Sequence, residues 1–118
     1  FVMAFKCYSK TFSSTANGTK TSSIIQVNKN FTIKQILLAG NTTSTFSDSI
    51  YIGLKVEDTD YFSPDLIPTS ALYQAAGSVY DLPVPLTVEA KKTIEVKLRN
   101  SLGSELTTFV ICLVGDEN

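Results

Sequence analysis

The sequence has no histidine, and this absence excludes several kinds of enzyme site. Histidine is the usual general base near neutral pH, a common ligand of catalytic zinc and a member of every Ser-His-Asp triad. The chain also shows no nucleophile–base pair, no glycine-rich phosphate loop and no metal-ligand spacing. Its carboxylates are dispersed, and only a pairing of two of them in space would allow glycoside hydrolysis. We therefore predict a protein that is not an enzyme and that needs no metal or cofactor.

Tryptophan is also missing, and neither sign of charge dominates. Immunoglobulin domains pack a tryptophan beside their disulfide, so its absence weakens an immunoglobulin interpretation. Lysine and arginine number 10 against 11 acidic residues, which leaves a formal net charge of −1. Nucleic acids and anionic membranes require a basic patch, so neither is expected as a partner. No apolar run approaches the roughly 20 residues of a membrane-spanning helix.

The strongest signals that are present lie between Leu82 and Gly115, where two strand patterns are joined by a turn. In residues 93–99 aliphatic and charged side chains alternate, which indicates a strand with one buried and one solvated face. Residues 100–104 contain turn formers. Residues 109–114 are apolar at every position, which is typical of a strand covered on both faces. We expect this pair of strands to organise the domain.

Other short strand patterns lie along the rest of the chain, at residues 1–8, 24–27, 31–39, 50–57, 78–80 and 86–89. Pro83 and Pro85 exclude central-sheet pairing at their position, which places that segment at an edge or a crossing between sheets. The connections between Val56 and Leu86 are long and broken by proline, which favours a Greek-key or jelly-roll order. The predicted fold class is all-β: a single-domain antiparallel β-sandwich over residues 1–118, most simply a jelly roll.

Residues 9–23 are dominated by serine, threonine, lysine and asparagine. Asn17-Gly18 in their middle is a turn signal. We predict a polar loop or arm here, with a polar hairpin as the alternative. On a rigid β scaffold such a segment is either a solvated loop or a binding arm.

The two cysteines, Cys7 and Cys112, lie near opposite ends of the chain and within apolar strand-like runs. They are interpreted first as two buried thiols that behave as small hydrophobic residues. A disulfide between the first and last strands is the alternative, and it requires Cα atoms within about 7 Å of each other. A reactive thiol is a third possibility, although neither cysteine has a fixed cationic neighbour in the sequence.

Two polar patterns invite binding hypotheses. Three Asn-x-Ser/Thr sequences begin at Asn17, Asn30 and Asn41. They would carry glycans in a secreted eukaryotic protein, but one or two are expected by chance in a chain rich in serine and threonine. Asp58, Asp60 and Asp65 place carboxylates close together, as calcium sites do. No EF-hand loop is present and aspartate is a common turn former, so no metal site is predicted.

One strand pattern has more apolar residues than the core of a sandwich requires. A two-sheet sandwich normally needs one apolar face per strand, and residues 109–114 offer two. We therefore expect a contact with a neighbouring subunit, unless loops of the same chain cover the second face. The candidate interface residues are Phe109, Val110, Ile111, Leu113 and Val114.

Three features of the second half of the chain support a resemblance. Residues 79–90 give a Pro-x-Pro entry and an apolar strand, residues 93–100 give an alternating strand that ends in asparagine, and a last apolar strand ends at Gly115. The order resembles that of small structural proteins of tailed bacteriophage virions. The resemblance implies a jelly roll that decorates or cements a capsid, commonly as a homotrimer, and it implies no catalytic residues. Residues 9–23 have no counterpart in it.

The sequence thus yields one preferred function and two alternatives. The preferred function is a non-enzymatic virion protein on the capsid surface, whose partners are its own copies and a major capsid protein. One alternative is a carbohydrate-binding or adhesin-type sandwich, for which the candidate aromatics are Tyr51, Tyr61, Tyr73 and Tyr80. The lack of tryptophan counts against stacking on sugars. The other alternative is a secreted receptor-type sandwich with a Cys7–Cys112 bond and glycans.

Overall fold

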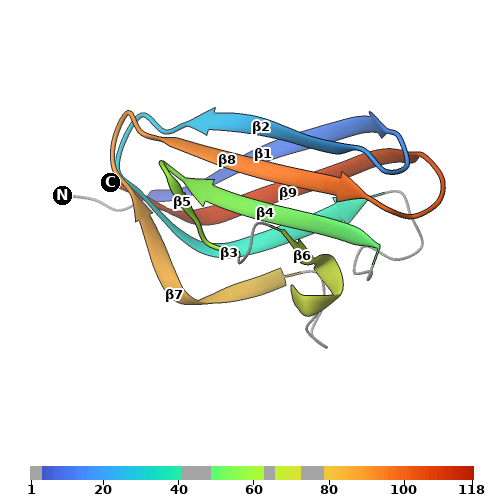
Figure 1. The fold of residues 1–118 in the computed structure, drawn as a ribbon. Helices are drawn as coiled ribbons and strands as arrows, with labels where there is room; N and C mark the ends of the chain where they lie inside the picture. The colour runs from blue at the N-terminus through green and yellow to red at the C-terminus, as the bar shows by residue number, and fades with distance from the viewer. Residues whose placement is uncertain (1–3, 41–48, 63–65, 73–78) are drawn as a thin grey trace.

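The computed structural model describes residues 4–40, 49–62, 66–72 and 79–118, which form two antiparallel β-sheets packed on each other (Figure 1). Sheet A contains, in spatial order, β1 (Ala4–Thr15), β9 (Leu106–Glu117), β3 (Phe31–Gly40) and β7 (Val79–Val88). Sheet B contains β2 (Lys20–Gln26), β8 (Thr93–Asn100), β4 (Ile50–Val56) and β5 (Thr59–Asp60), with β6 (Ile67–Pro68) also paired to β4. A short 3₁₀ helix, η1 (Thr69–Leu72), follows β6. The predicted single-domain antiparallel β-sandwich is confirmed.

The strands pair in a nested order: β1 with β9, β2 with β8, β3 with β7, and β4 with β5 and β6. Successive pairs alternate between sheet A and sheet B. The chain is therefore one long hairpin, bent after β4 and rolled up, which is the order of a jelly roll. Its outermost pair joins the first and last strands, so that Ala4 lies opposite Glu117.

Alternation along the strands fills the space between the sheets with apolar side chains. The predicted inward residues of β4, Ile50, Ile52 and Leu54, are at most 2% exposed. Phe31 of β3 and Phe109 of β9 are fully buried. The other core residues are Phe12, Ile25, Val27, Ile33, Ile36, Leu38, Val56, Leu72, Val88, Ile94, Val96, Leu98, Leu106, Ile111 and Leu113. Each large side chain that is fully buried stabilises the fold by about 1.5–3 kcal/mol relative to an exposed one.

The prediction of a loop or arm at residues 9–23 is wrong, because β1 and β2 occupy most of this stretch. Phe12 anchors it: this side chain is buried and lies opposite Phe109 of β9. The serines and threonines around it suit an edge strand whose other face is solvated. The chain turns near Gly18, which has a φ of +80°. The hairpin alternative is closer, although β1 and β2 belong to different sheets.

The prolines of β7 lie at the edge of sheet A, as predicted. The ladder between β3 and β7 stops at Asp81 and resumes at Leu86. We call the residues between them, 82–85, the proline arch. Pro83 and Pro85 offer no N–H group to a ladder, so the arch both interrupts the pairing with β3 and protects this edge from further pairing.

Gly115 does not end the last strand but lies within β9, where it allows a close approach to β3. Here β3 contains one extra residue, since Ile33 pairs with Gly115 whereas Gln35 pairs with Val114. A Cβ atom on Gly115 would overlap the carbonyl oxygen of Thr32 and crowd the backbone of β3. Glycine is therefore required by the contact at this bulge.

Replacing Gly115 tests this contact. Gly115→Ala is expected to lower the free energy of unfolding by about 3 kcal/mol or more, because backbone must move to admit the methyl group. Gly103→Ala is the matched control: Gly103 has a φ of +89°, and a methyl group there would meet no other atom within 4 Å. Only the backbone cost of about 1–2 kcal/mol therefore applies at Gly103. Urea denaturation of both variants provides the comparison, and equal losses would contradict the close approach.

The buried side chain of Asn100 ties together the two turns at one end of the sandwich. Its Nδ2 donates to the carbonyl oxygens of Thr15 (3.0 Å) and Ser104 (2.8 Å). Its Oδ1 accepts a hydrogen bond from the N–H of Leu102 (2.9 Å). Its backbone oxygen accepts another from Gly18 (2.7 Å). The turn after β1 is thereby fixed to the turn after β8.

Removal of this amide should lower the stability of the protein, because it leaves buried backbone groups without hydrogen-bond partners. Asn100→Ala is expected to destabilise the protein by about 3 kcal/mol. The exposed Asn28 serves as the control, and Asn28→Ala should change stability by less than about 0.5 kcal/mol. Thermal and chemical denaturation measure both variants. A loss at Asn100 no larger than that at Asn28 would show that water replaces the amide.

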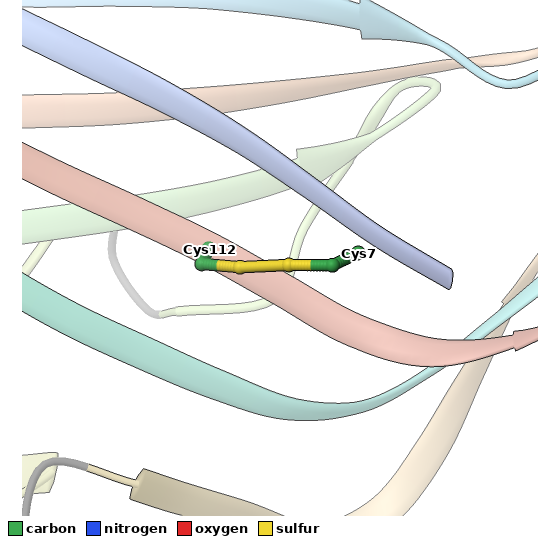
Figure 2. Close-up of a disulfide and its surroundings, with 2 residues drawn as sticks. All are labelled: Cys7 and Cys112. Atoms are coloured by element: carbon green, nitrogen blue, oxygen red, sulfur yellow. A yellow bond between two sulfur atoms is a disulfide. The ribbon is translucent and has the colours of Figure 1, made fainter. Parts of the chain in front are cut away.

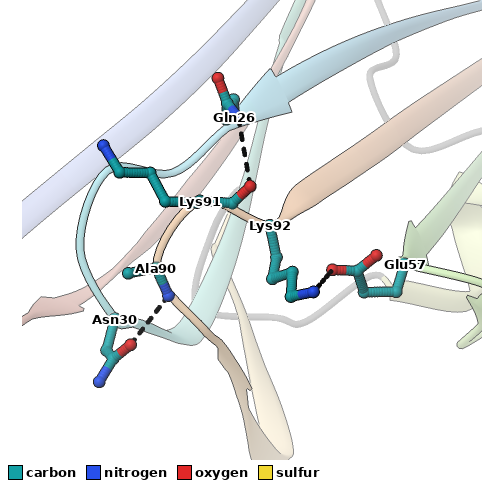
Figure 3. A network of polar contacts seen from close by, with 6 residues as sticks. All are labelled: Gln26, Asn30, Glu57, Ala90, Lys91 and Lys92. Atoms are coloured by element: carbon teal, nitrogen blue, oxygen red, sulfur yellow. Dashed lines mark hydrogen bonds and ion pairs between the residues drawn. The ribbon is translucent and has the colours of Figure 1, made fainter.

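The opposite end is held by an interlock between the turn after β2 and the turn after β7 (Figure 3). The N–H of Lys91 donates to the carbonyl oxygen of Val27 (2.8 Å). The side chain of Asn30 accepts from the N–H of Ala90 (2.8 Å), and that of Gln26 donates to the oxygen of Lys91 (3.2 Å). Lys91 has a φ of +71°, a left-handed conformation that these contacts hold in place.

A disulfide joins Cys7 of β1 to Cys112 of β9 (Figure 2). Their Cα atoms are 6.5 Å apart. They are diagonal neighbours in the ladder, because Cys7 lies opposite Val114 and Cys112 opposite Ser9. Cys7 is exposed and Cys112 is partly exposed on the outer face of sheet A. The interpretation of two buried thiols is therefore wrong, since strand alternation points both side chains away from the core.

Candidate interaction surface

The outer face of sheet A carries a strip of apolar side chains across β9, β3 and β7. Directly opposite residues in a sheet point to the same face. Val110 lies opposite Ala39, Cys112 lies opposite Leu37, and Leu37 lies opposite Val79. We call the following residues the outer strip: Leu37, Ala39, Val79, Val110, Cys112 and Val114. None of them is buried: Ala39 is exposed, and the other five are partly exposed.

The five candidate interface residues divide between the two faces of β9. Phe109, Ile111 and Leu113 are at most 2% exposed and point into the core, so their assignment to a subunit interface is wrong. Val110 and Val114 belong to the outer strip and are partly exposed. Their role in an interface stays a prediction. The apolar excess of residues 109–114 is thus two-sided, as expected, but only alternate residues are available to a partner.

One end of the outer strip opens into a groove of about 460 Å³. The side chain of Phe5 on β1, which is 76% exposed, lines it together with Val114. Charged and polar side chains on β3, β7 and β9 also line it, and they are already paired. Lys34 forms an ion pair with Asp116, and Gln35 donates a hydrogen bond of 2.7 Å to Asp81. The groove therefore offers an apolar floor beside satisfied polar groups, as protein interfaces do.

The inner side of β1 is polar where it approaches the end of β9. The hydroxyl of Tyr8 donates to Glu117 Oε2 (2.9 Å), and its ring stands edge-on to Phe31 with centroids 4.9 Å apart. Burial raises the pKa of Tyr8, and the hydrogen bond to the Glu117 carboxylate raises it further. A backbone hydrogen bond at Asn28 lowers the pKa, but the net direction is upward. Lys6 Nζ lies 5.1 Å from the Tyr8 ring centroid. Tyr8 thus acts here as a neutral donor.

The candidate tyrosines of a sugar site do not form one platform. Tyr61 and Tyr80 line a groove of about 360 Å³, which also contacts β4, β6 and the proline arch of β7. Tyr51 lies on the outer face of sheet B, with the Arg99 guanidinium 5.8 Å from its ring centroid. Tyr73 lies outside the described residues. The groove of Tyr61 and Tyr80 is otherwise lined by apolar side chains among the residues described, so it lacks the polar groups that hold a sugar.

The acidic residues considered for calcium have other roles or lie apart. Asp60 accepts a hydrogen bond from Lys97 Nζ at 2.8 Å, and Lys97 is buried although it lies on the outer face of sheet B. The predicted solvated position of Lys97 is therefore wrong, because this ion pair covers it. Asp58 is exposed, and Asp65 lies outside the described residues. No group of three or more potential metal ligands occurs in the part of the chain that the structure describes.

The three Asn-x-Ser/Thr sequences differ in what the structure shows of them. Asn17 is exposed, and its Oδ1 accepts from the N–H of Gly103 (2.8 Å). Asn30 is exposed and belongs to the interlock drawn in Figure 3. Asn41 lies outside the described residues. Glycosylation at these positions stays a hypothesis.

Comparison with known proteins adds no relative to this picture. No protein-family model matches the chain, and no curated protein matches it. Within the described residues, no helix has the length and apolar character needed to cross a membrane. The functional argument therefore depends on the fold and on the outer face of sheet A.

The disulfide, whose Cys112 belongs to the outer strip, makes a testable contribution to stability. It closes a loop of 105 residues, so in the chain-entropy model its removal costs up to about 5 kcal/mol, and about 2–5 kcal/mol is typical of small domains. The double variant Cys7→Ser/Cys112→Ser should lose this amount in chemical denaturation. Mass spectrometry of the native chain without reductant gives the control. Two free thiols there would contradict the disulfide and the receptor-type alternative together.

Proposed function

We propose that this protein is a non-enzymatic viral structural protein, a capsid decoration, cement or minor capsid jelly roll. It acts on the capsid surface through shape and surface contacts rather than through chemistry. Its partners in this proposal are other copies of itself, most simply in a homotrimer, and a major capsid protein. The resemblance of residues 79–115 to small structural proteins of tailed bacteriophage virions motivates the choice of a capsid.

The outer strip is the observation that carries the proposal. Within sheet A, β9 and β3 are apolar on the inner face, as a sandwich requires, and the sheet is apolar again over β9, β3 and β7 on its outer face. Contiguous apolar side chains on an outer face are typical of interaction surfaces. The paired polar groups around the neighbouring groove add the polar rim that interfaces have.

The mechanism follows from mass action. A protein that binds only the assembled lattice lowers the free energy of that state and leaves free subunits unchanged. Association of several copies adds avidity, because each further contact forms at a high effective concentration. A rigid jelly roll suits this task, since its two ends are fixed by the Asn100 network and by the interlock of Figure 3.

Native mass tests the self-association. Light scattering of the purified chain should give a closed oligomer, with a trimer as the expected state. Val110→Lys/Val114→Lys should shift it to monomer, because each lysine places a charge in the buried centre of the contact. Ile24→Lys is the control: Ile24 is 61% exposed on sheet B, so its replacement should leave the oligomer intact. Circular dichroism confirms that the variants fold.

A monomer for the unchanged chain at micromolar concentration would contradict the proposal. It would favour the alternative of a carbohydrate-binding or adhesin-type module, which a glycan screen would then examine. An oligomer that survives Val110→Lys/Val114→Lys but falls apart with Ile24→Lys would move the contact to sheet B. Light scattering distinguishes both outcomes, because each is a change in native mass.

A further inference from the structure

The free edge of β1 differs from the other edges of the two sheets. An edge strand exposes unpaired N–H and C=O groups, and proteins usually blunt such edges with prolines, short strands or charges. β7 contains the proline arch, and β5 and β6 have two residues each. β2 has seven residues, whereas β1 has 12 and contains neither proline nor glycine. Among the residues described, β1 pairs on one side only, with β9.

The surroundings of β1 leave room for another strand. A groove of about 400 Å³ separates part of β1 from the neighbouring edge of β2. Its lining residues are uncharged, and most of them carry hydroxyl groups, as Thr11, Ser13 and Thr21 do. The outward side chains of β1 beside this groove, such as Thr11 and Ser13, are small and exposed. They do not obstruct main-chain hydrogen bonds to a strand laid against the edge.

Two lysines set the chemistry of that edge. Lys6 and Lys10 lie on the inner side of β1, opposite Gly115 and Ile111 of β9, and both are partly exposed. Within the described part of the chain neither forms an ion pair, and Lys6 contacts the ring of Tyr8. Because they are four residues apart on a strand, they present two positive charges about 13 Å apart along the edge.

These lysines disfavour a second copy of β1 as the added strand. Two copies that pair antiparallel about a twofold axis must keep inner residues opposite inner residues. Each such register that pairs at least nine of the 12 residues puts Lys10 directly opposite a lysine of the other copy, or diagonal to one. Like charges so placed are destabilising, whereas opposite charges across strands are favourable. The same lysines therefore select against self-pairing and for an acidic strand.

We propose that the free edge of β1 binds an extended strand of a partner protein that carries acidic side chains four residues apart. The strand joins sheet A beside β1, main-chain hydrogen bonds supply the affinity, and ion pairs with Lys6 and Lys10 fix its register. This contact goes beyond the proposed function, because it names the chemistry of a partner at an edge that the outer strip does not use.

A synthetic peptide tests the proposal directly. The probe is Thr-Val-Ser-Glu-Thr-Val-Ser-Glu-Thr, fluorescently labelled, whose antiparallel docking sets its glutamates opposite Lys6 and Lys10 and its valines opposite Tyr8 and Phe12. Anisotropy gives the affinity, and hydrogen exchange followed by NMR locates the site. We expect saturable binding that protects amides of β1. The same peptide with lysines for glutamates, or with a central proline, should not bind.

A charge exchange provides the matched variants. Lys10→Glu should weaken binding of the acidic peptide by about tenfold, since an attraction becomes a repulsion. It should also strengthen binding of the lysine peptide. Lys29→Glu makes the same change in net charge at an exposed residue in the turn after β2, and should alter either affinity by less than about twofold.

The proposal would be overturned by no binding of the acidic peptide at millimolar concentration, by protection of amides outside β1, or by equal effects of Lys10→Glu and Lys29→Glu. Protection of β1 that grows with protein concentration in the absence of peptide would also overturn it, because a second copy would then occupy the edge. Val110→Lys/Val114→Lys should bind the peptide normally. Failure at the edge and failure of self-association through the outer strip are thus separate results.

Discussion

The position of β9 between β1 and β3 is the constraint on which the rest of the structure depends. Its inner residues, Phe109, Ile111 and Leu113, form the middle of the core from sheet A. Its ladder holds the first strand of the chain, and the Cys7–Cys112 disulfide makes that attachment covalent. Without β9, β1 would have no partner strand among the residues described, and the nested order of strands could not close. The alternation that fills the core from one face of β9 also produces the outer strip on the other.

The two ends of the sandwich are fixed by different physical means. At one end the Asn100 amide satisfies backbone groups from two turns, so a single buried side chain holds them together. At the other end backbone hydrogen bonds link the turns after β2 and β7, and Lys91 accepts a left-handed conformation to make them. These contacts set the spacing of the sheets. They leave the outer strip, apart from Cys112 and its disulfide, and the free edge of β1 as surfaces whose groups are not needed to hold the fold.

Alternation of apolar residues made much of the fold predictable from the sequence. It located β4 and β8, and the prolines placed β7 at an edge. It failed for residues 9–23, because edge strands rich in serine and threonine have little apolar signal and Phe12 alone marks the buried face.

The cysteines were misjudged for a related reason: an apolar run does not reveal which of its residues face the core. Phe109 and Val110 are equally apolar in sequence, and only the register with β3 separates core from surface. The role of Asn100 and the cover over Lys97 depend on residues distant in sequence, which no local pattern reports.

In the two proposals, the outer strip and the β1 edge divide two tasks between two kinds of force. Apolar contact is strong but poorly directional, so the strip can hold copies together without specifying much about them. A strand edge is directional, since its hydrogen bonds accept only an extended chain in register, and the inner lysines add selection by charge. In the proposed arrangement the edge lysines also disfavour pairing between β1 strands of two copies, which is the hazard of an unprotected edge. A protein that must associate with its own kind and yet attach to something else needs such a separation, because one surface used for both would let each partner compete with the other. The sequence of β1 suits such a separation, because it contains neither proline nor glycine and its only charged residues are Lys6 and Lys10.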